Sequence, residues 1–148
     1  MTRRTFLAAA AALAGAALAA RSAPPPEPKL QFGEREQAAV GAAQAWLALV
    51  DAGKYDAAWA DAAPLLKDAI AAAPFAEATA AARRPFGALV GRKVLAATFA
   101  ASLPGAPDGE YVVIQFETRF EKKAAAVETV TPMRAADGRW RVSGYFVR

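Results

Sequence analysis

Residues 110–120 read EYVVIQFETRF, and this stretch decides the fold. From Val112 to Phe120 every second side chain is apolar or threonine, and from Gln115 onward polar or charged side chains lie between them, which is typical of a half-buried β-strand. Two further strands are expected in AVETVTPMRA at 126–135 and RWRVSGYFVR at 139–148, because Asp137-Gly138 between them favours a tight hairpin turn. A sheet with one apolar face needs a cover from the rest of the chain.

The preceding residues supply that cover as helices. Apolar residues recur at helical spacing from 34 to 52, and Gly53 follows as a stop signal. Shorter helices are expected at 55–62, at 64–72, and from Pro74 to the residue before Arg84. A first strand at 92–102 and a turn-rich loop at 103–109 complete the pattern. Residues 34–148 therefore predict an α+β domain with N-terminal helices packed on one face of a four-stranded antiparallel sheet.

The first 20 residues have the three parts of a secretory signal peptide: a basic start, an Ala/Leu run and an A-x-A pattern at 17–19. Residues 2–7 read TRRTFL and resemble the twin-arginine export motif, although an ordinary secretory leader with Arg3 and Arg4 is the alternative. The run is too short for a retained membrane span. Residues 21–33 contain four prolines and predict an extended tether. We therefore expect a periplasmic or secreted protein.

Composition narrows the chemistry. The formal net charge is +4, two of these charges belong to Arg3 and Arg4, and acidic residues interrupt the remaining basic ones, so no nucleic-acid partner is expected. The chain has no His and no Cys, which removes the commonest general base, thiolate metal sites and thiol nucleophiles. No catalytic residue, metal or cofactor is predicted. The scattered helical carboxylates lack the spacing of a calcium loop and are expected on solvated faces: Asp51, Asp56, Asp61 and Asp68.

Several segments resemble the bacterial family called domain of unknown function 4019. They are LPGAPDGEYVVIQFETRFEKK at 103–123, VETVT at 127–131, GRWRVSGYF at 138–146, YDAAW at 55–59 and RPFG at 84–87. Phe86 stands where the family pattern has Leu, which is a conservative change. The resemblance extends over roughly residues 34–148. It implies a small exported domain of the α+β cone type shared by nuclear-transport-factor-2-like and cystatin-like proteins, and it brings no established activity and no catalytic residues.

The candidate binding residues are of two kinds. Trp59 belongs to a set of aromatic residues that form either the core or the lining of a pocket between helices and sheet, and Arg84 is either a ligand-pairing or a structural arginine. If strict alternation holds along 139–148, Trp140, Val142 and Phe146 face the helices. The residues expected together on the opposite face, as a surface for docking a protein, are Arg119, Arg139, Arg141 and Tyr145.

Two functions remain open. The first is a non-catalytic binding module for a partner protein or a small apolar ligand, which predicts that no ionisable pair lies in the pocket. The second is a cofactor-free enzyme, which requires a buried Asp or Glu beside a Tyr in a cavity, as cone folds allow.

Overall fold

The computed structural model describes residues 23–26 and 30–148, and its folded unit is Gln31–Arg148. The predicted signal peptide at 1–20 lies outside the described residues, as does part of the predicted tether. The described tether residues, 23–26 and 30–33, are in neither helix nor strand. Across the described ranges, none of the helices combines the length and the apolar character that crossing a membrane requires.

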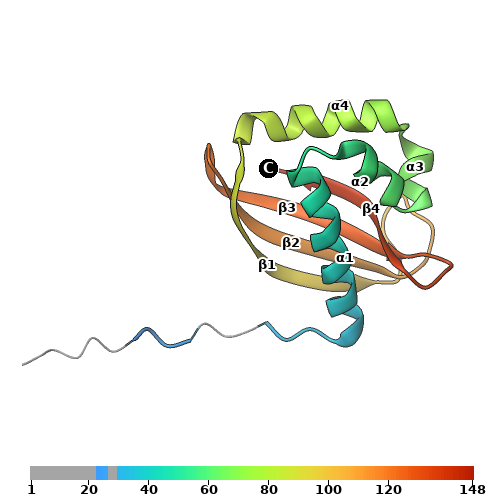
Figure 1. Cartoon of the computed structure of the whole chain (residues 1–148). Coiled ribbons are helices and arrows are strands. Elements are labelled where there is room, and N and C mark those ends of the chain that lie inside the picture. The colour runs from blue at the N-terminus through green and yellow to red at the C-terminus, as the bar shows by residue number, and fades with distance from the viewer. Residues whose placement is uncertain (1–22, 27–29) are drawn as a thin grey trace, which may run out of the picture. The chain divides into compact units, whose positions relative to one another are not determined.

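Four helices precede the sheet, as predicted (Figure 1). They are α1 (Glu34–Asp51), α2 (Tyr55–Asp61), α3 (Pro64–Ala69) and α4 (Ala72–Arg83), and a short 3-10 turn, η1 (Arg84–Phe86), follows. Gly53 has a φ of 73°, the left-handed conformation that ends α1. The third helix is shorter than predicted because Ile70 adopts an extended backbone, and α4 begins two residues before Pro74.

The sheet is an antiparallel meander in the order β1-β2-β3-β4, which confirms the predicted α+β class. Its strands are β1 (Leu89–Ala100), β2 (Tyr111–Phe120), β3 (Lys123–Arg134) and β4 (Trp140–Val147). The first strand begins three residues earlier than predicted. Gly138 has a φ of 82°, as expected for the hairpin between β3 and β4.

The core lies between the helices and one face of the sheet (Figure 1). The alternating side chains of β2 face inward, and Val112, Ile114 and Phe116 are fully buried. Trp46 on α1 fills the centre of this layer, with its Nε1 donating to the carbonyl oxygen of Ala58 at 2.8 Å. Helix α1 therefore packs against the sheet through an indole whose single polar atom has a hydrogen-bond partner.

One extra residue interrupts the regular ladder of β4. Thr131 of β3 pairs with Gly144, and the next residue, Pro132, pairs with Val142, so Ser143 has no partner of its own. Its Oγ donates to the Thr131 carbonyl oxygen at 2.7 Å. Ser143 therefore forms a β-bulge, which changes the facing of every later side chain in the strand.

This bulge corrects the predicted faces of two aromatic residues. Tyr145 lies opposite Val130 and packs edge-on against Trp46, with ring centroids 5.3 Å apart, so it faces the helices. Phe146 faces the other way and is 56% exposed. The prediction that Phe146 is inward and Tyr145 outward is wrong because strict alternation counts Ser143 as a regular strand residue.

Candidate functional site

A carboxylate lies in the core of the domain. Glu128 on β3 is completely buried. Its Oε1 accepts hydrogen bonds from Thr118 Oγ1 at 2.6 Å and Arg92 Nε at 2.7 Å, and its Oε2 accepts one from the Tyr145 hydroxyl at 2.5 Å. Both carboxylate oxygens are thus satisfied, which a buried charge requires.

Asp51, the last residue of α1, is the second carboxylate of the same cluster. It accepts two hydrogen bonds from Arg92, at 2.8 and 3.0 Å, and one from Arg83 Nη2 at 2.8 Å. Arg83 Nη1 lies 4.0 Å from Glu128 Oε2. Two carboxylates and two guanidinium groups therefore form a charge-balanced cluster, which we call the buried quartet: Asp51, Arg83, Arg92 and Glu128.

The pKa values in this cluster follow from burial and pairing. Burial alone would raise the pKa of Asp51, but the hydrogen bonds from Arg92 and Arg83 lower it below its ordinary value of 3.8. Burial would lower the pKa values of Arg83 and Arg92, but Asp51 and Glu128 raise them. Burial, together with the nearby Glu128 carboxylate, raises the pKa of Tyr145 above its ordinary value of 10.0. Tyr145 therefore remains a neutral donor at physiological pH.

The buried quartet is hard to predict from the sequence because its members are far apart along the chain. The hydrogen-bonded pairs are separated by 32 to 41 positions. The expectation that Asp51 lies on a solvated helix face is wrong. One signal was present. Glu128 lies two residues before Val130 and therefore on the same face of β3, so the alternation of the strand places a charged residue at a core position.

The pair formed by Glu128 and Tyr145 matches part of what the enzyme hypothesis requires, and the binding-module hypothesis did not expect it. A general base must come within hydrogen-bond distance of the proton it removes. Glu128 has no exposed surface, and its oxygens already accept three hydrogen bonds. Of the two, Tyr145 lines a groove between α4 and β4 and Glu128 does not. This geometry suits a packed structural pair better than a reacting one.

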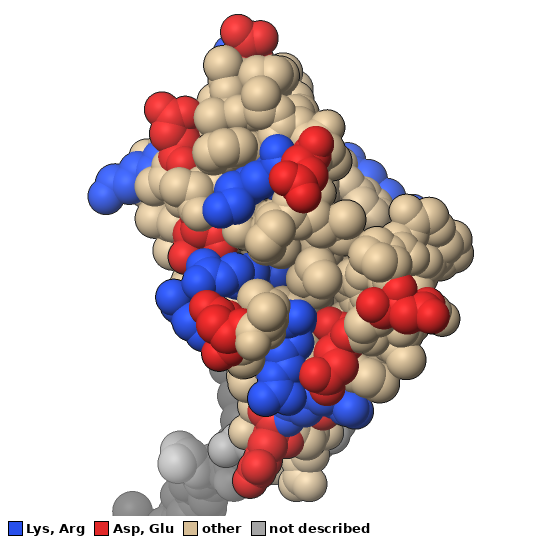
Figure 2. Space-filling view, turned by 90° about the vertical axis from the view of Figure 1, so that its right-hand side faces the viewer, with Lys and Arg blue, Asp and Glu red and all other residues tan. Residues whose placement is uncertain are grey.

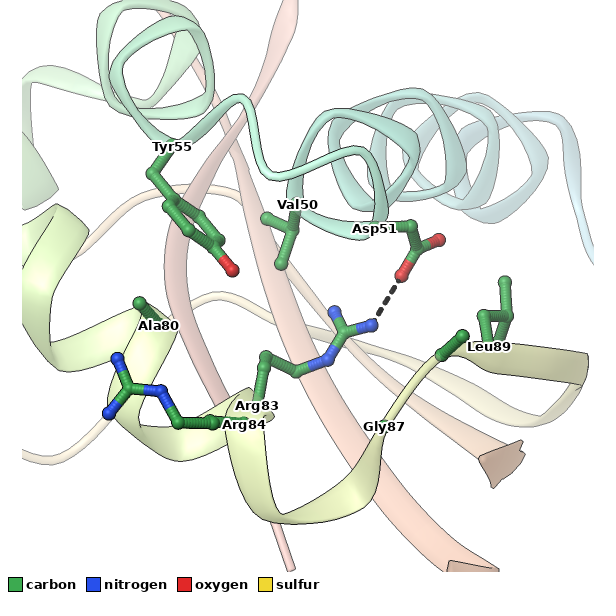
Figure 3. A pocket seen from close by; sticks show the side chains of 9 residues that line it. Val50, Asp51, Tyr55, Ala80, Arg83, Arg84, Gly87 and Leu89 are labelled. Carbon is green, nitrogen blue, oxygen red and sulfur yellow. Dashed lines mark hydrogen bonds and ion pairs between the residues drawn. The ribbon is translucent and has the colours of Figure 1, made fainter. Parts of the chain in front are cut away.

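A polar pocket of about 370 Å³ is lined in part by Asp51 and Arg83 of the buried quartet (Figure 3). Its wall combines the end of α1, the start of α2, the last turns of α4, and the segment that leads into β1. We call it the Arg84 pocket, and its lining residues are Val50, Asp51, Tyr55, Ala80, Arg83, Arg84, Gly87, Ala88 and Leu89.

The two consecutive arginines of this pocket have different surroundings. Arg83 turns toward Asp51 and is 7% exposed, whereas Arg84 extends away from Asp51 and is exposed (Figure 3). Within residues 30–148, Arg84 makes no ion pair, and neither its guanidinium nor the Tyr55 hydroxyl makes a hydrogen bond. The pocket therefore offers one cationic and one hydroxyl donor that the described fold does not use.

Trp59 has a structural position instead. Its Nε1 donates to the Ile70 carbonyl oxygen at 2.8 Å, which ties α2 to the end of α3, and its ring packs against the core. The other candidates are dispersed. Figure 2 shows basic and acidic side chains interspersed on the face drawn. Arg141 makes ion pairs with Asp61 at 3.7 Å and with Asp137 at 3.1 Å.

Arg119 does not join Arg141 and Arg139 in one patch. Arg141 pairs with Met133, and Met133 pairs with Tyr111 at the start of β2. Arg119 is at the far end of β2, about 27 Å away at about 3.4 Å per residue. The predicted common surface is therefore wrong in part: Arg119 is on the outer face, as predicted, but at its opposite end, and Tyr145 lies on the inner face.

The family model described as "Protein of unknown function (DUF4019)" matches residues 42–145, which is more than half of the chain. The chain belongs to the DUF4019 family. All four residues of the buried quartet and both donors of the Arg84 pocket lie inside the matched DUF4019 region. Comparisons with curated proteins and with solved structures found no match. The cone-type relationship implied for DUF4019 stays a prediction.

The DUF4019 domain offers no obvious metal centre in the part of the chain described. No group of three His, Cys, Asp or Glu side chains there could hold a metal ion. Its chemistry is therefore best judged from the Arg84 pocket, where unused donors meet apolar walls.

Proposed function

We propose that this protein is an exported, non-catalytic binding module that holds a small ligand with one carboxylate and an apolar body in the Arg84 pocket. The observation that carries the proposal is the pairing pattern of the pocket wall. Asp51 and Arg83 neutralise each other, while Arg84 and the Tyr55 hydroxyl make no hydrogen bond to another described residue.

The charges around the pocket favour an anion. Asp51 is the one acidic residue in the lining, and two guanidinium groups, from Arg83 and Arg92, already bind it. Arg84 is therefore a cation at the edge of the pocket that has no ion-pair partner among the described residues. A guanidinium binds a carboxylate through hydrogen bonds that are shorter and stronger than those between neutral groups.

The remaining wall sets the size and polarity of the ligand. Val50, Ala80 and Leu89 contribute apolar surface, and Leu89 is 37% exposed. A volume of about 370 Å³ is near the lower end of the range for small-molecule pockets. A short aliphatic or aromatic carboxylate fits both the volume and the mixture of one cationic group with apolar walls.

A panel of straight-chain carboxylates from butanoate to decanoate, titrated into the folded domain by calorimetry, tests this function. We expect one chain length to bind best. Arg84→Ala should weaken that binding about 10- to 100-fold, because a charge-assisted hydrogen bond contributes about 1.5–3 kcal/mol. Tyr55→Phe should weaken it about 5-fold.

Arg119→Ala is the matched control, because it also removes one exposed arginine but on the far face of the sheet. It should leave the carboxylate affinity unchanged. Equal losses in Arg84→Ala and Arg119→Ala would mean that net charge, and not the pocket, attracts the ligand. No binding by any member of the panel would refute the ligand class.

Export is the second part of the proposal. It rests on the sequence of residues 1–20, where a basic start, an apolar run and a small-residue cleavage pattern follow one another.

A further inference from the structure

The free edge of β4 has unpaired backbone groups. β4 is the last strand of the sheet, so among the described strands only β3 pairs with it. Arg148 and Val127 exchange two hydrogen bonds, at 2.9 and 3.1 Å, which fixes the phase of the ladder. In an antiparallel pair, hydrogen-bonded and non-hydrogen-bonded positions alternate. The N–H and C=O groups of Tyr145 and Val147 therefore point away from β3, toward the free edge.

Val142 lies three residues before Tyr145, and because the bulge at Ser143 shifts the alternation by one residue, its carbonyl group also points toward the free edge. The Val142 carbonyl oxygen accepts a hydrogen bond from the Ala63 N–H at 2.8 Å, so the link between α2 and α3 covers the edge at that point. No such cover is present at Tyr145 or Val147 within the described residues. Buried or half-buried backbone groups are nearly always paired, so two neighbouring unpaired residues on an edge strand need an explanation.

An apolar groove of about 370 Å³ runs beside these groups, between α4 and β4. We call it the β4 groove. Ile70, Phe75, Ala78 and Ala82 line its helical side, and Tyr145 and Phe146 line its strand side. α4 runs along the β4 side of the sheet (Figure 1). The lining contains no charged residue.

We propose that the β4 groove binds an extended peptide of a partner protein, which adds a fifth strand to the sheet. Only an extended chain presents alternating N–H and C=O groups that match those of Tyr145 and Val147. Its inward side chains enter the apolar groove, and its outward ones cover Phe146, which is the most exposed large aromatic side chain on the sheet.

Two arginines near the ends of β4 favour acidic residues at the ends of that peptide. Arg139 lies just before β4 and Arg148 just after it, and neither makes an ion pair within the described residues. Residues 142–147 between them carry no charge. The partner segment is therefore apolar at alternate positions and acidic at its ends. A second copy of this chain fits less well, because its own β4 carries arginines at both ends.

The probe is the acetylated and amidated peptide Asp-Val-Thr-Val-Thr-Val-Asp, titrated into the ¹⁵N-labelled domain and followed by amide chemical shifts and hydrogen exchange. We expect the Tyr145 and Val147 amides to shift and to exchange at least 10-fold more slowly, while the amides already paired with β3 change little. Replacing both Asp residues of the peptide by Lys should weaken binding about 3- to 10-fold.

Val147→Pro and Val147→Ala separate the backbone from the side chain. Both substitutions remove contacts of the Val147 side chain, but only proline also removes the N–H that points toward the free edge. Because that N–H does not pair with β3, proline leaves the β3–β4 hydrogen bonds intact. Val147→Pro should bind the peptide at least 10-fold more weakly than Val147→Ala, with both variants folded by circular dichroism.

Three results would overturn the proposal. They are equal affinities of Val147→Pro and Val147→Ala, unchanged Tyr145 and Val147 amides at millimolar peptide, and a dimer in sedimentation velocity that protects both amides without peptide. The last result would assign the β4 edge to a second copy. Because the test reads β4 and not Arg84, its failure leaves the carboxylate-binding proposal untouched.

Discussion

Glu128→Gln tests whether the buried quartet holds the domain together. The substitution keeps the shape of the side chain and removes its charge. Arg92 then loses a charged acceptor at 2.7 Å, and Arg83 loses its second carboxylate, at 4.0 Å. Arg83 Nε and Nη1 already have no hydrogen-bond partner in the described structure, so this arginine depends on nearby negative charge.

The expected loss in the free energy of unfolding is large. The quartet has two positive and two negative members, and the variant leaves one buried positive charge in excess. Removing one partner of a buried ion pair costs about 3–5 kcal/mol. A small domain has a total unfolding free energy of about 5–15 kcal/mol, so the variant should fold but be severely weakened. The corresponding fall in Tm is about 10–20 °C for a domain of this size.

The measurement is the free energy of unfolding from urea titrations of the wild type and the variant. Glu117→Gln is the matched control, because Glu117 is an exposed strand glutamate whose ion pair with Lys93, at 3.3 Å, lies on the other face of the sheet. Exposed pairs contribute about 0.2–1 kcal/mol. A loss of less than about 1 kcal/mol in Glu128→Gln, or a loss equal to that of the control, would refute the assigned role of the quartet.

Three further predictions concern acid stability, tyrosine ionisation and export. The pKa of Asp51 is lowered on folding, so its contribution to stability is present above about pH 4 and is lost as the pH falls through the folded-state pKa. Asp51→Asn should therefore reduce the free energy of unfolding at pH 7, and in urea titrations at acid pH the stability of the variant should fall less steeply than that of the wild type. An equally steep fall in both proteins would contradict this. In absorbance titrations, one phenol should ionise only well above pH 10, and Tyr145→Phe should remove that late step; its persistence would show that another tyrosine causes it. In a leader fusion to a reporter that folds only in the cytoplasm, replacing Arg3 and Arg4 by Lys should abolish export, and unchanged export would exclude the twin-arginine route.

Local patterns in the sequence predict most of the fold. The alternation from Val112 to Phe120 predicts β2 and its buried face, and the helical spacing before Gly53 predicts α1 to within one residue. These elements are predictable because a strand with one buried face and an amphipathic helix each impose a period on neighbouring residues. The Asp137-Gly138 turn is local in the same sense.

The candidate site is less predictable because its residues come from helices and strands that are far apart in the sequence. Arg84 was identified as a possible ligand-pairing residue, and it lines the proposed pocket. The residues beneath it were missed, since nothing local links Asp51 to Arg83 or to Arg92. Their association depends on how α1, α4 and β1 converge in three dimensions, which periodicity does not encode. Only Glu128, a charged residue at a core position, carried a local sign of the cluster.

Ser143 has a consequence for how this chain can vary in length. Because the residue bulges out of the ladder, a chain without it would continue from Val142 to Gly144 as a regular strand and still direct Tyr145 toward Glu128. Loss of Tyr145 would instead turn Phe146 toward the core. Family members whose β4 differs in length by one residue can therefore share one core, provided that the gap in their alignment is placed at the bulge.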